Sequence, residues 1–193
     1  IAYICFYKQV NLFVVAVSGK KRIQKNLYKE CKVNDFLIIN DIWLPVSENK
    51  IRHIDTIIFG NKYIYICKIV KQAGEVKIAL DDQKWRVIYH GQLTLIDNPF
   101  LYNRKIVTAL SNVVEGLEEK DMKSLVILTK TCDFNSVSGS NNEFIVCEKE
   151  AIKLILDIEK NSDEDVFDPY EIERYAKAFY EQGLKSEEIR KQK

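Results

Sequence analysis

The chain has 193 residues, of which 47% are hydrophobic and 30% are charged. This composition is typical of a folded domain with its own core, and it excludes an intrinsically disordered protein. The formal net charge of +1 neither favours nor excludes a nucleic-acid partner. The first 77 residues carry 13 Lys/Arg against 6 Asp/Glu. That surplus is compatible with a surface facing phosphate, and equally with lysine-rich faces of strands.

The cysteines and histidines narrow the choice of compartment and metal site. Five cysteines are scattered along the chain without a CxxC pair, at Cys5, Cys31, Cys67, Cys132 and Cys147. This pattern excludes a zinc knuckle and argues against a disulfide framework, so we expect a reducing compartment, the cytoplasm. Only two histidines are present, His53 and His90, which excludes a histidine-rich metal centre.

Residues 1–18 form a mostly apolar N-terminal segment. It is too short for a complete membrane span, and Lys8, Gln9 and Asn11 interrupt it. Two interpretations stay open. The segment is either a buried first helix or strand, or the end of a membrane anchor whose basic flank from Lys20 onward lies on the cytoplasmic side.

The first predicted elements after this segment are a helix and a strand. Ile23 and Leu27 lie one turn apart within residues 20–28, which predicts a helix with a basic outer face. Residues 35–46 form an apolar run that ends at Pro45, and this run is typical of a strand.

The middle of the chain predicts strands interrupted by one helix. A hairpin is expected around Gly60-Asn61, and Asn98-Pro99 predicts the start of a helix that runs through Leu110. Further strands are expected at residues 75–80, 84–91, 93–96, 124–130 and 142–147, followed by a helix at 148–158. This order predicts a mixed α/β domain with a central sheet flanked by helices.

The composition changes near residue 161, where an acidic linker leads to a helical tail. Asp168-Pro169 is a good helix start, and Gly183 is expected to end this helix before a last short one. The stripe of Ile172, Tyr175 and Phe179 predicts packing. We therefore divide the chain into 1–18, a domain at 19–160, and a tail at 161–193. The tail either docks on the domain or binds another protein.

Asp55 and Lys68 are the residues that point to chemistry. Metal-dependent phosphodiester cleavage needs carboxylates to hold a divalent ion and a lysine near the attacking water. The predicted hairpin places Asp55 and Lys68 on neighbouring strands, where their side chains can meet. A plain cross-strand salt bridge would explain this pair equally well. His53 shares the strand with Asp55 and is expected to pair with it rather than to bind a metal.

The surrounding residues strengthen the case for a nuclease. In order along the chain stand Gly19, the run Asn40 to Pro45, Ile54-Asp55, the run Phe59 to Lys68, Gly74, Trp85 and Asn98-Pro99. This arrangement resembles the NERD (nuclease-related) domain over about Gly19 to Leu128. NERD is a bacterial branch of the PD-(D/E)XK nucleases that is often found behind a membrane anchor. The resemblance implies a restriction-endonuclease-like fold and a partner, DNA, with Mg²⁺ or Mn²⁺ as cofactor if the site is active.

The departures from the family pattern imply weak or lost cleavage. Lys20 stands where the family has glutamate, and Cys67 or Ile66 stands where it has the acid before the lysine. Asp55 alone would hold the ion weakly. Rescue by Glu75, Asp81 or Asp82 has no support from spacing.

Two functions remain compatible with the sequence. The domain binds or processes DNA, with contacts expected from Lys20, Lys21, Arg22 and Lys25. The alternative is an inactive scaffold, tethered to a membrane, that binds other proteins.

Overall fold

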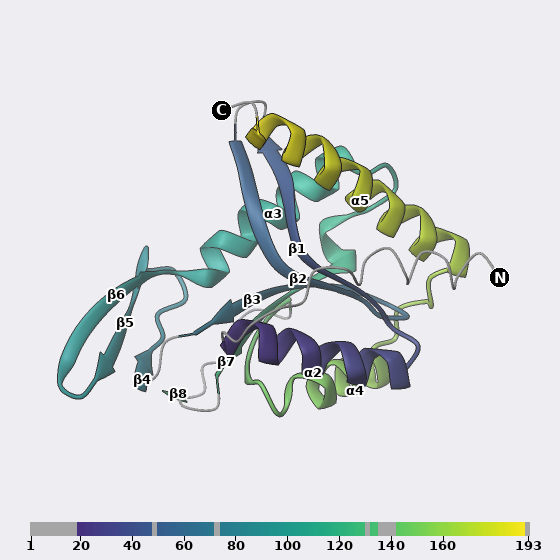
Figure 1. Cartoon of the computed structure of the whole chain (residues 1–193). Helices are drawn as coiled ribbons and strands as arrows, with labels where there is room; N and C mark the ends of the chain where they lie inside the picture. Colours follow the sequence, from purple (N-terminus) through teal and green to yellow (C-terminus); the bar gives the residue numbers. More distant parts are fainter. Residues whose placement is uncertain (1–18, 48–49, 72–73, 130–131, 135–141, 192–193) are drawn as a thin grey trace.

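The computed structural model describes residues 19–47, 50–71, 74–129, 132–134 and 142–191 (Figure 1). The apolar segment 1–18, with both of its interpretations, lies outside these residues. Among the helices of the described ranges, none is long and apolar enough to cross a membrane.

A five-stranded mixed sheet forms the centre of the molecule, in the order β1-β2-β3-β7-β9. Strands β1, β2 and β3 pair antiparallel, whereas β3, β7 and β9 pair parallel. All seven residues of β7 are buried, as expected for a strand covered on both faces. The bounds are β1 Leu37–Ser47, β2 Lys50–Phe59, β3 Ile64–Val70, β7 Met122–Leu128 and β9 Glu143–Cys147.

Helices cover both faces of this sheet (Figure 1). Helices α2 (Gly19–Val33) and α4 (Ala151–Asn161) lie on one face, where Leu27 and Ile155 are buried in one cluster. Helices α3 (Pro99–Val113) and α5 (Pro169–Lys191) lie on the other, where Ile106 and Phe179 are buried in a second cluster. A short 3₁₀ helix, η1 (Glu119–Asp121), leads into β7. The predicted mixed α/β sheet flanked by helices is confirmed.

Helix α3 begins where the sequence predicts. The Asn98 side chain caps it by accepting a hydrogen bond of 2.9 Å from the Phe100 backbone N–H, and Pro99 occupies its first turn. The Asn98 amide also donates to three backbone carbonyls of the preceding loop, those of Ala79, Leu80 and Asp82. The cap therefore fixes both the start of the helix and the loop before it.

The helical tail docks on the sheet. Tyr175 and Phe179 of α5 are buried, and the Phe179 ring lies 5.6 Å from that of Phe59 on β2. The packing predicted for this stripe is confirmed, but the predicted helix end at Gly183 is wrong. Gly183 lies inside α5 against β1, where a Cβ would come within 2.7 Å of the Ile42 side chain.

The three strands predicted between residues 75 and 96 belong to a separate four-stranded sheet, in the order β6-β5-β4-β8. Its fourth strand, β8, was not predicted. Trp85 of β5 is fully buried in its core, and its indole N–H donates to the Ala79 carbonyl at 2.9 Å. The bounds are β4 Gly74–Lys77, β5 Lys84–Tyr89, β6 Gln92–Asp97 and β8 Cys132–Phe134.

Candidate functional site

Asp55 lies where β2 and β3 separate. The two strands pair from Phe59 opposite Ile64 to Thr56 opposite Cys67, and the pairing ends there. The next residue on β2 is Asp55, whose side chain is 5% exposed. Its Oδ2 accepts a hydrogen bond of 2.9 Å from the Ile69 backbone N–H of β3. The carboxylate therefore accepts a hydrogen bond from a backbone N–H that has no partner on β2 once the strand pairing has ended.

Three basic side chains surround this carboxylate. Lys68 Nζ lies 3.3 Å from Asp55 Oδ2, so the predicted meeting of these two residues is confirmed. His53 Nδ1 lies 3.3 Å from Oδ1, which confirms the expected pairing. Lys20 Nζ lies closest, 2.7 Å from Oδ1. It comes from the first turn of α2, so this helix is tied to the sheet through its own N-terminal residue.

A second carboxylate, Asp41 of β1, completes the cluster. It lies across from Asp55, between the pairs Asn40–Thr56 and Ile42–Ile54. Its φ of 56° is left-handed, a conformation that aspartate tolerates better than most residues. Asp41 Oδ1 lies 2.5 Å from Lys20 Nζ and 3.2 Å from His53 Nε2. Lys20 and His53 thus each bridge the two carboxylates. We call these five residues (Lys20, Asp41, His53, Asp55 and Lys68) the Asp55 cluster.

The family resemblance included Asp41 in the run Asn40 to Pro45 but gave it no role, whereas the hairpin register did indicate its position. Ser47 pairs with Lys50 at the turn between β1 and β2. Counting back from this turn places Asp41 opposite Asp55 to within one residue. Two carboxylates directly opposite each other repel, so a cation between them could have been expected.

The pKa values reflect this pairing of charges. Burial alone would raise the pKa of Asp55, but hydrogen bonds from His53 and Lys20 and the charge of Lys68 outweigh it and hold that pKa well below its usual range. Burial likewise opposes ionisation of Asp41, and hydrogen bonds from His53 and Lys20 lower its pKa to about 2. Burial would lower the pKa of His53, yet hydrogen bonds to both carboxylates raise it. The cluster therefore favours ionised carboxylates and a protonated imidazole.

Tyr102 of α3 joins this cluster to the helix. Its hydroxyl donates to the His53 carbonyl at 2.7 Å, and the His53 backbone N–H donates to the same hydroxyl at 3.1 Å. Lys68 Nζ lies 4.5 Å from the centre of the Tyr102 ring, and the Arg52 guanidinium lies 4.7 Å from it. Both are within the range of a cation–π contact. One ring therefore positions two cationic side chains.

The comparison with known proteins identifies the family. The family model of the nuclease-related domain (NERD) matches residues 17–129, more than half of the chain. The chain belongs to the NERD family. No match was found among curated proteins or among solved structures. The matched range agrees with the resemblance expected from Gly19 to Leu128.

The metal expected for an active NERD domain does not fit these residues. Mg²⁺ and Mn²⁺ prefer several oxygen ligands, including carboxylates. Here Lys20 Nζ lies between the two carboxylates, where an ion bridging them would have to bind. Two ammonium groups already balance the two carboxylate charges. No group of three or more His, Cys, Asp or Glu within the described ranges is arranged to hold a metal ion.

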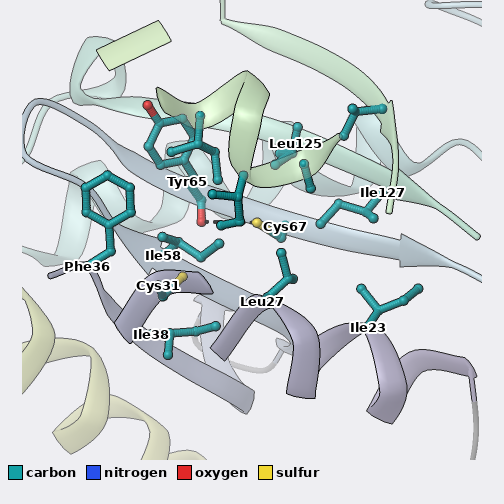
Figure 2. Close-up of a cluster of buried hydrophobic side chains, with 14 of the residues drawn as sticks. Ile23, Leu27, Cys31, Phe36, Ile38, Ile58, Tyr65, Cys67, Leu125 and Ile127 are labelled. Atoms are coloured by element: carbon teal, nitrogen blue, oxygen red, sulfur yellow. Dashed lines mark hydrogen bonds between the residues drawn. The ribbon is translucent and has the colours of Figure 1, made fainter. Parts of the chain in front are cut away.

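The structure distinguishes the two positions considered for the missing NERD acid. Successive residues of a strand point to opposite faces. Ile66 is fully buried on the α3 face, the face on which Lys68 contacts Tyr102. Cys67 points the other way, into the core beneath α2, close to Leu27 and Cys31 (Figure 2). Ile66, not Cys67, therefore lies where an acid would face the lysine.

Cys67 is accordingly a core residue. Its thiol donates to the Tyr65 carbonyl at 3.7 Å (the dashed line in Figure 2). Burial, together with the neighbouring Cys31 and Asp55, raises the pKa of Cys67 well above its usual value. A buried neutral thiol is a poor metal ligand, because thiolate is the form that binds.

The three carboxylates considered as substitutes lie elsewhere. Glu75 of β4 is near Lys77, at 3.9 Å, and Asp81 accepts a hydrogen bond of 3.1 Å from Arg104. Asp82 contributes its backbone carbonyl to the Asn98 cap. Within the described structure, none of the three contacts Asp55. The carboxylate that does reach this region is Asp41, which shares Lys20 and His53 with it.

The four residues expected to contact DNA have different environments. Lys20 is only 12% exposed and belongs to the Asp55 cluster. Arg22 forms two hydrogen bonds to Glu148, of 3.0 and 2.8 Å. Lys21 and Lys25 are exposed on α2. The basic charge of this helix is therefore partly neutralised by carboxylates of the protein itself.

Proposed function

We propose that this NERD domain binds DNA and has lost metal-dependent cleavage. One observation carries the proposal: the ammonium group of Lys20 lies 2.7 Å from Asp55 and 2.5 Å from Asp41. A nuclease of this class needs a divalent ion beside its aspartate, and here that position is next to a fixed positive charge of the chain.

An ammonium group cannot supply the chemistry of a metal ion. It can balance the charge of two carboxylates, but it neither polarises a phosphoryl oxygen as a Lewis acid nor lowers the pKa of a bound water. The neighbouring position that faces Lys68 is occupied by Ile66, which is fully buried and offers no ligand. The cluster is thus suited to a structural role in this fold.

DNA binding does not depend on cleavage. Phosphate contacts from lysine and arginine supply most of the sequence-independent affinity of proteins for DNA. Lys68 is 27% exposed beside Tyr102, where it remains accessible to a phosphate group. Membership of the nuclease-related family supports DNA as the polyanion, in preference to a scaffold that only binds proteins.

Two measurements test this proposal together. Fluorescence anisotropy with a labelled duplex oligonucleotide should show binding that weakens steeply with salt and is not lost when EDTA replaces Mg²⁺ or Mn²⁺. A plasmid-nicking assay of the same preparation should show no metal-dependent cleavage, for the wild type and for Asp55→Ala alike.

Other outcomes would contradict one half of the proposal. Mg²⁺-dependent nicking by the wild type that disappears in Asp55→Ala would show that catalysis survives. Absence of any salt-dependent binding at low ionic strength would exclude the DNA-binding function and favour the scaffold.

A further inference from the structure

A pocket of about 390 Å³ lies between helix α3 and the turn-proximal ends of β1 and β2. We call it the α3 pocket. Its lining combines cationic, hydrogen-bonding and apolar side chains, namely Val46, Lys50, Arg52, Arg104, Lys105, Thr108, Ala109 and Asn112. Four of these are lysine or arginine, and none of the described lining residues is a carboxylate. An anion is therefore the kind of ligand whose charge this pocket complements.

The cations reach the pocket from two elements. Lys50 and Arg52 are two residues apart on β2, so both side chains point to the α3 side of the sheet. Arg104 and Lys105 come from α3, with Thr108 one turn further along the helix. Two elements that are packed against each other thus hold these groups around one space.

Not all four cations are equally available. Arg104 binds Glu143 through two hydrogen bonds of 2.6 and 2.8 Å and also contacts Asp81, so its charge is already matched. Lys50, Arg52 and Lys105 have no ion pair to a carboxylate within the described residues. The pocket consequently has a surplus of about three positive charges that an external ligand can neutralise.

Arg52 connects the pocket to the Asp55 cluster. Its guanidinium stacks on Tyr102 at 4.7 Å, and Lys68 contacts the same ring at 4.5 Å. Lys68 in turn reaches Asp55. Cationic groups therefore continue from the point where β2 and β3 separate, across Tyr102, to the α3 pocket. A ligand with several phosphates in a row matches this line better than a single small anion does.

We propose that the α3 pocket binds backbone phosphates of a nucleic-acid strand and is the main contact of this protein with DNA. This inference rests on the proposed function and deepens it, because it assigns the bound strand to the α3 face rather than to the exposed lysines of α2. Guanidinium and ammonium groups with nearby hydroxyl and amide side chains are the groups that contact phosphates in protein–DNA interfaces.

A matched pair of double variants tests the assignment. Lys50→Gln with Lys105→Gln removes two exposed charges from the pocket, and Lys25→Gln with Lys29→Gln removes two exposed charges from α2 on the opposite face. Anisotropy is measured for both, and for the wild type, with the same oligonucleotide between about 50 and 200 mM salt. Circular dichroism and thermal unfolding check that both variants are folded.

The pocket variant should bind at least about tenfold more weakly, with a salt slope reduced by about two, while the α2 variant stays within about twofold of the wild type. Equal binding by the wild type and the pocket variant, or a loss confined to the α2 variant, would overturn the inference and leave the proposed function intact. Absence of binding by the wild type would overturn both.

A mononucleotide titration distinguishes a strand from a free nucleotide as the source of the phosphate. We expect a mononucleotide to displace the oligonucleotide only at concentrations far above those of the unlabelled oligonucleotide. Displacement at equal or lower concentration would assign the pocket to a free nucleotide and overturn the inference.

Discussion

Cationic side chains gather at two places in this NERD domain, and the two differ in their partners. In the Asp55 cluster, Lys20 and Lys68 meet the carboxylates of Asp41 and Asp55 at distances between 2.5 and 3.3 Å. In the α3 pocket, by contrast, the lining residues that the structure describes include no carboxylate. Lys20 and Lys68 thus have carboxylate partners within the protein, whereas Lys50, Arg52 and Lys105 of the pocket have none among the described residues.

This difference shows that a cluster of lysine and arginine side chains does not by itself indicate a site for an anionic ligand. The formal net charge of +1 indicates neither the Asp55 cluster nor the α3 pocket. Whether a lysine binds a ligand depends on whether a carboxylate of the same chain already lies beside it. Buried pairs are costly to break, because removing one partner leaves the other charged and unsatisfied.

The largest effect is expected from Asp55→Ala. This change removes the partner of Lys20, Lys68 and the Ile69 N–H at once. The free energy of unfolding, measured by urea denaturation, should fall by about 3 kcal/mol. The control Asp97→Ala removes an exposed carboxylate that lies 3.9 Å from Lys84, and it should cost less than about 1 kcal/mol. Equal effects of the two changes would contradict a structural role for the Asp55 cluster.

A smaller but more specific effect is expected from Lys20→Ala. Without this ammonium group, only His53 bridges the carboxylates of Asp41 and Asp55. The free energy of unfolding should fall by about 2 kcal/mol, and Mn²⁺ should restore about 1–2 kcal/mol of it, because an ion that binds only the folded state stabilises it. Thermal unfolding with and without Mn²⁺ measures this response, which the wild type should lack. A wild type that responds as strongly would mean that Lys20 does not exclude the ion.

The smallest effect concerns pH. The pKa of His53 is raised in the folded state by its hydrogen bonds to the two carboxylates. Its stabilising contribution is therefore complete below the unfolded pKa of about 6.5 and is lost as the pH rises through the folded value. The lowered pKa values of Asp41 and Asp55 change the stability only in acid. Their stabilising contribution is complete above the unfolded pKa of about 3.9 and is lost as the pH falls through the lower folded values.

Urea denaturation between about pH 5.5 and 8.5 tests whether the free energy of unfolding falls as the pH rises. The wild type should lose stability toward the upper end, on the order of 1 kcal/mol or less for a partly exposed pair, and His53→Gln should remove this slope. A slope that persists in His53→Gln would assign the pH dependence to another group.

Local signals in the sequence were sufficient for much of this fold. The Gly60-Asn61 turn and the Asn98-Pro99 cap each act within a few residues, and both predictions are confirmed. The meeting of Asp55 and Lys68 followed from the hairpin alone. These features depend on residues that are close together along the chain, and such short-range patterns can be read directly from a sequence.

Other features depend on contacts between distant segments. Asp41 adopts a left-handed conformation, and Lys20, which bridges it to Asp55 alongside His53, comes from the distant helix α2. Gly183 lies inside α5 instead of ending it, and the close approach of Ile42 leaves no room there for a side chain. The sequence analysis left open whether Cys67 or Ile66 replaces the acid, although strand alternation would have placed Ile66 on the side of Lys68. The core beneath α2 was needed to show what Cys67 contacts.

The family match ends at residue 129, yet the sheet does not. Strand β9 pairs with β7 beyond that boundary, and α5 places Phe179, which is fully buried, against the opposite sheet face from α4. A fragment cut at residue 129 would leave β7, all of whose residues are buried in the intact chain, as an open sheet edge. Unprotected apolar edges pair with other chains and aggregate. The segment that the family model matches is therefore shorter than the segment that we expect to be needed for folding.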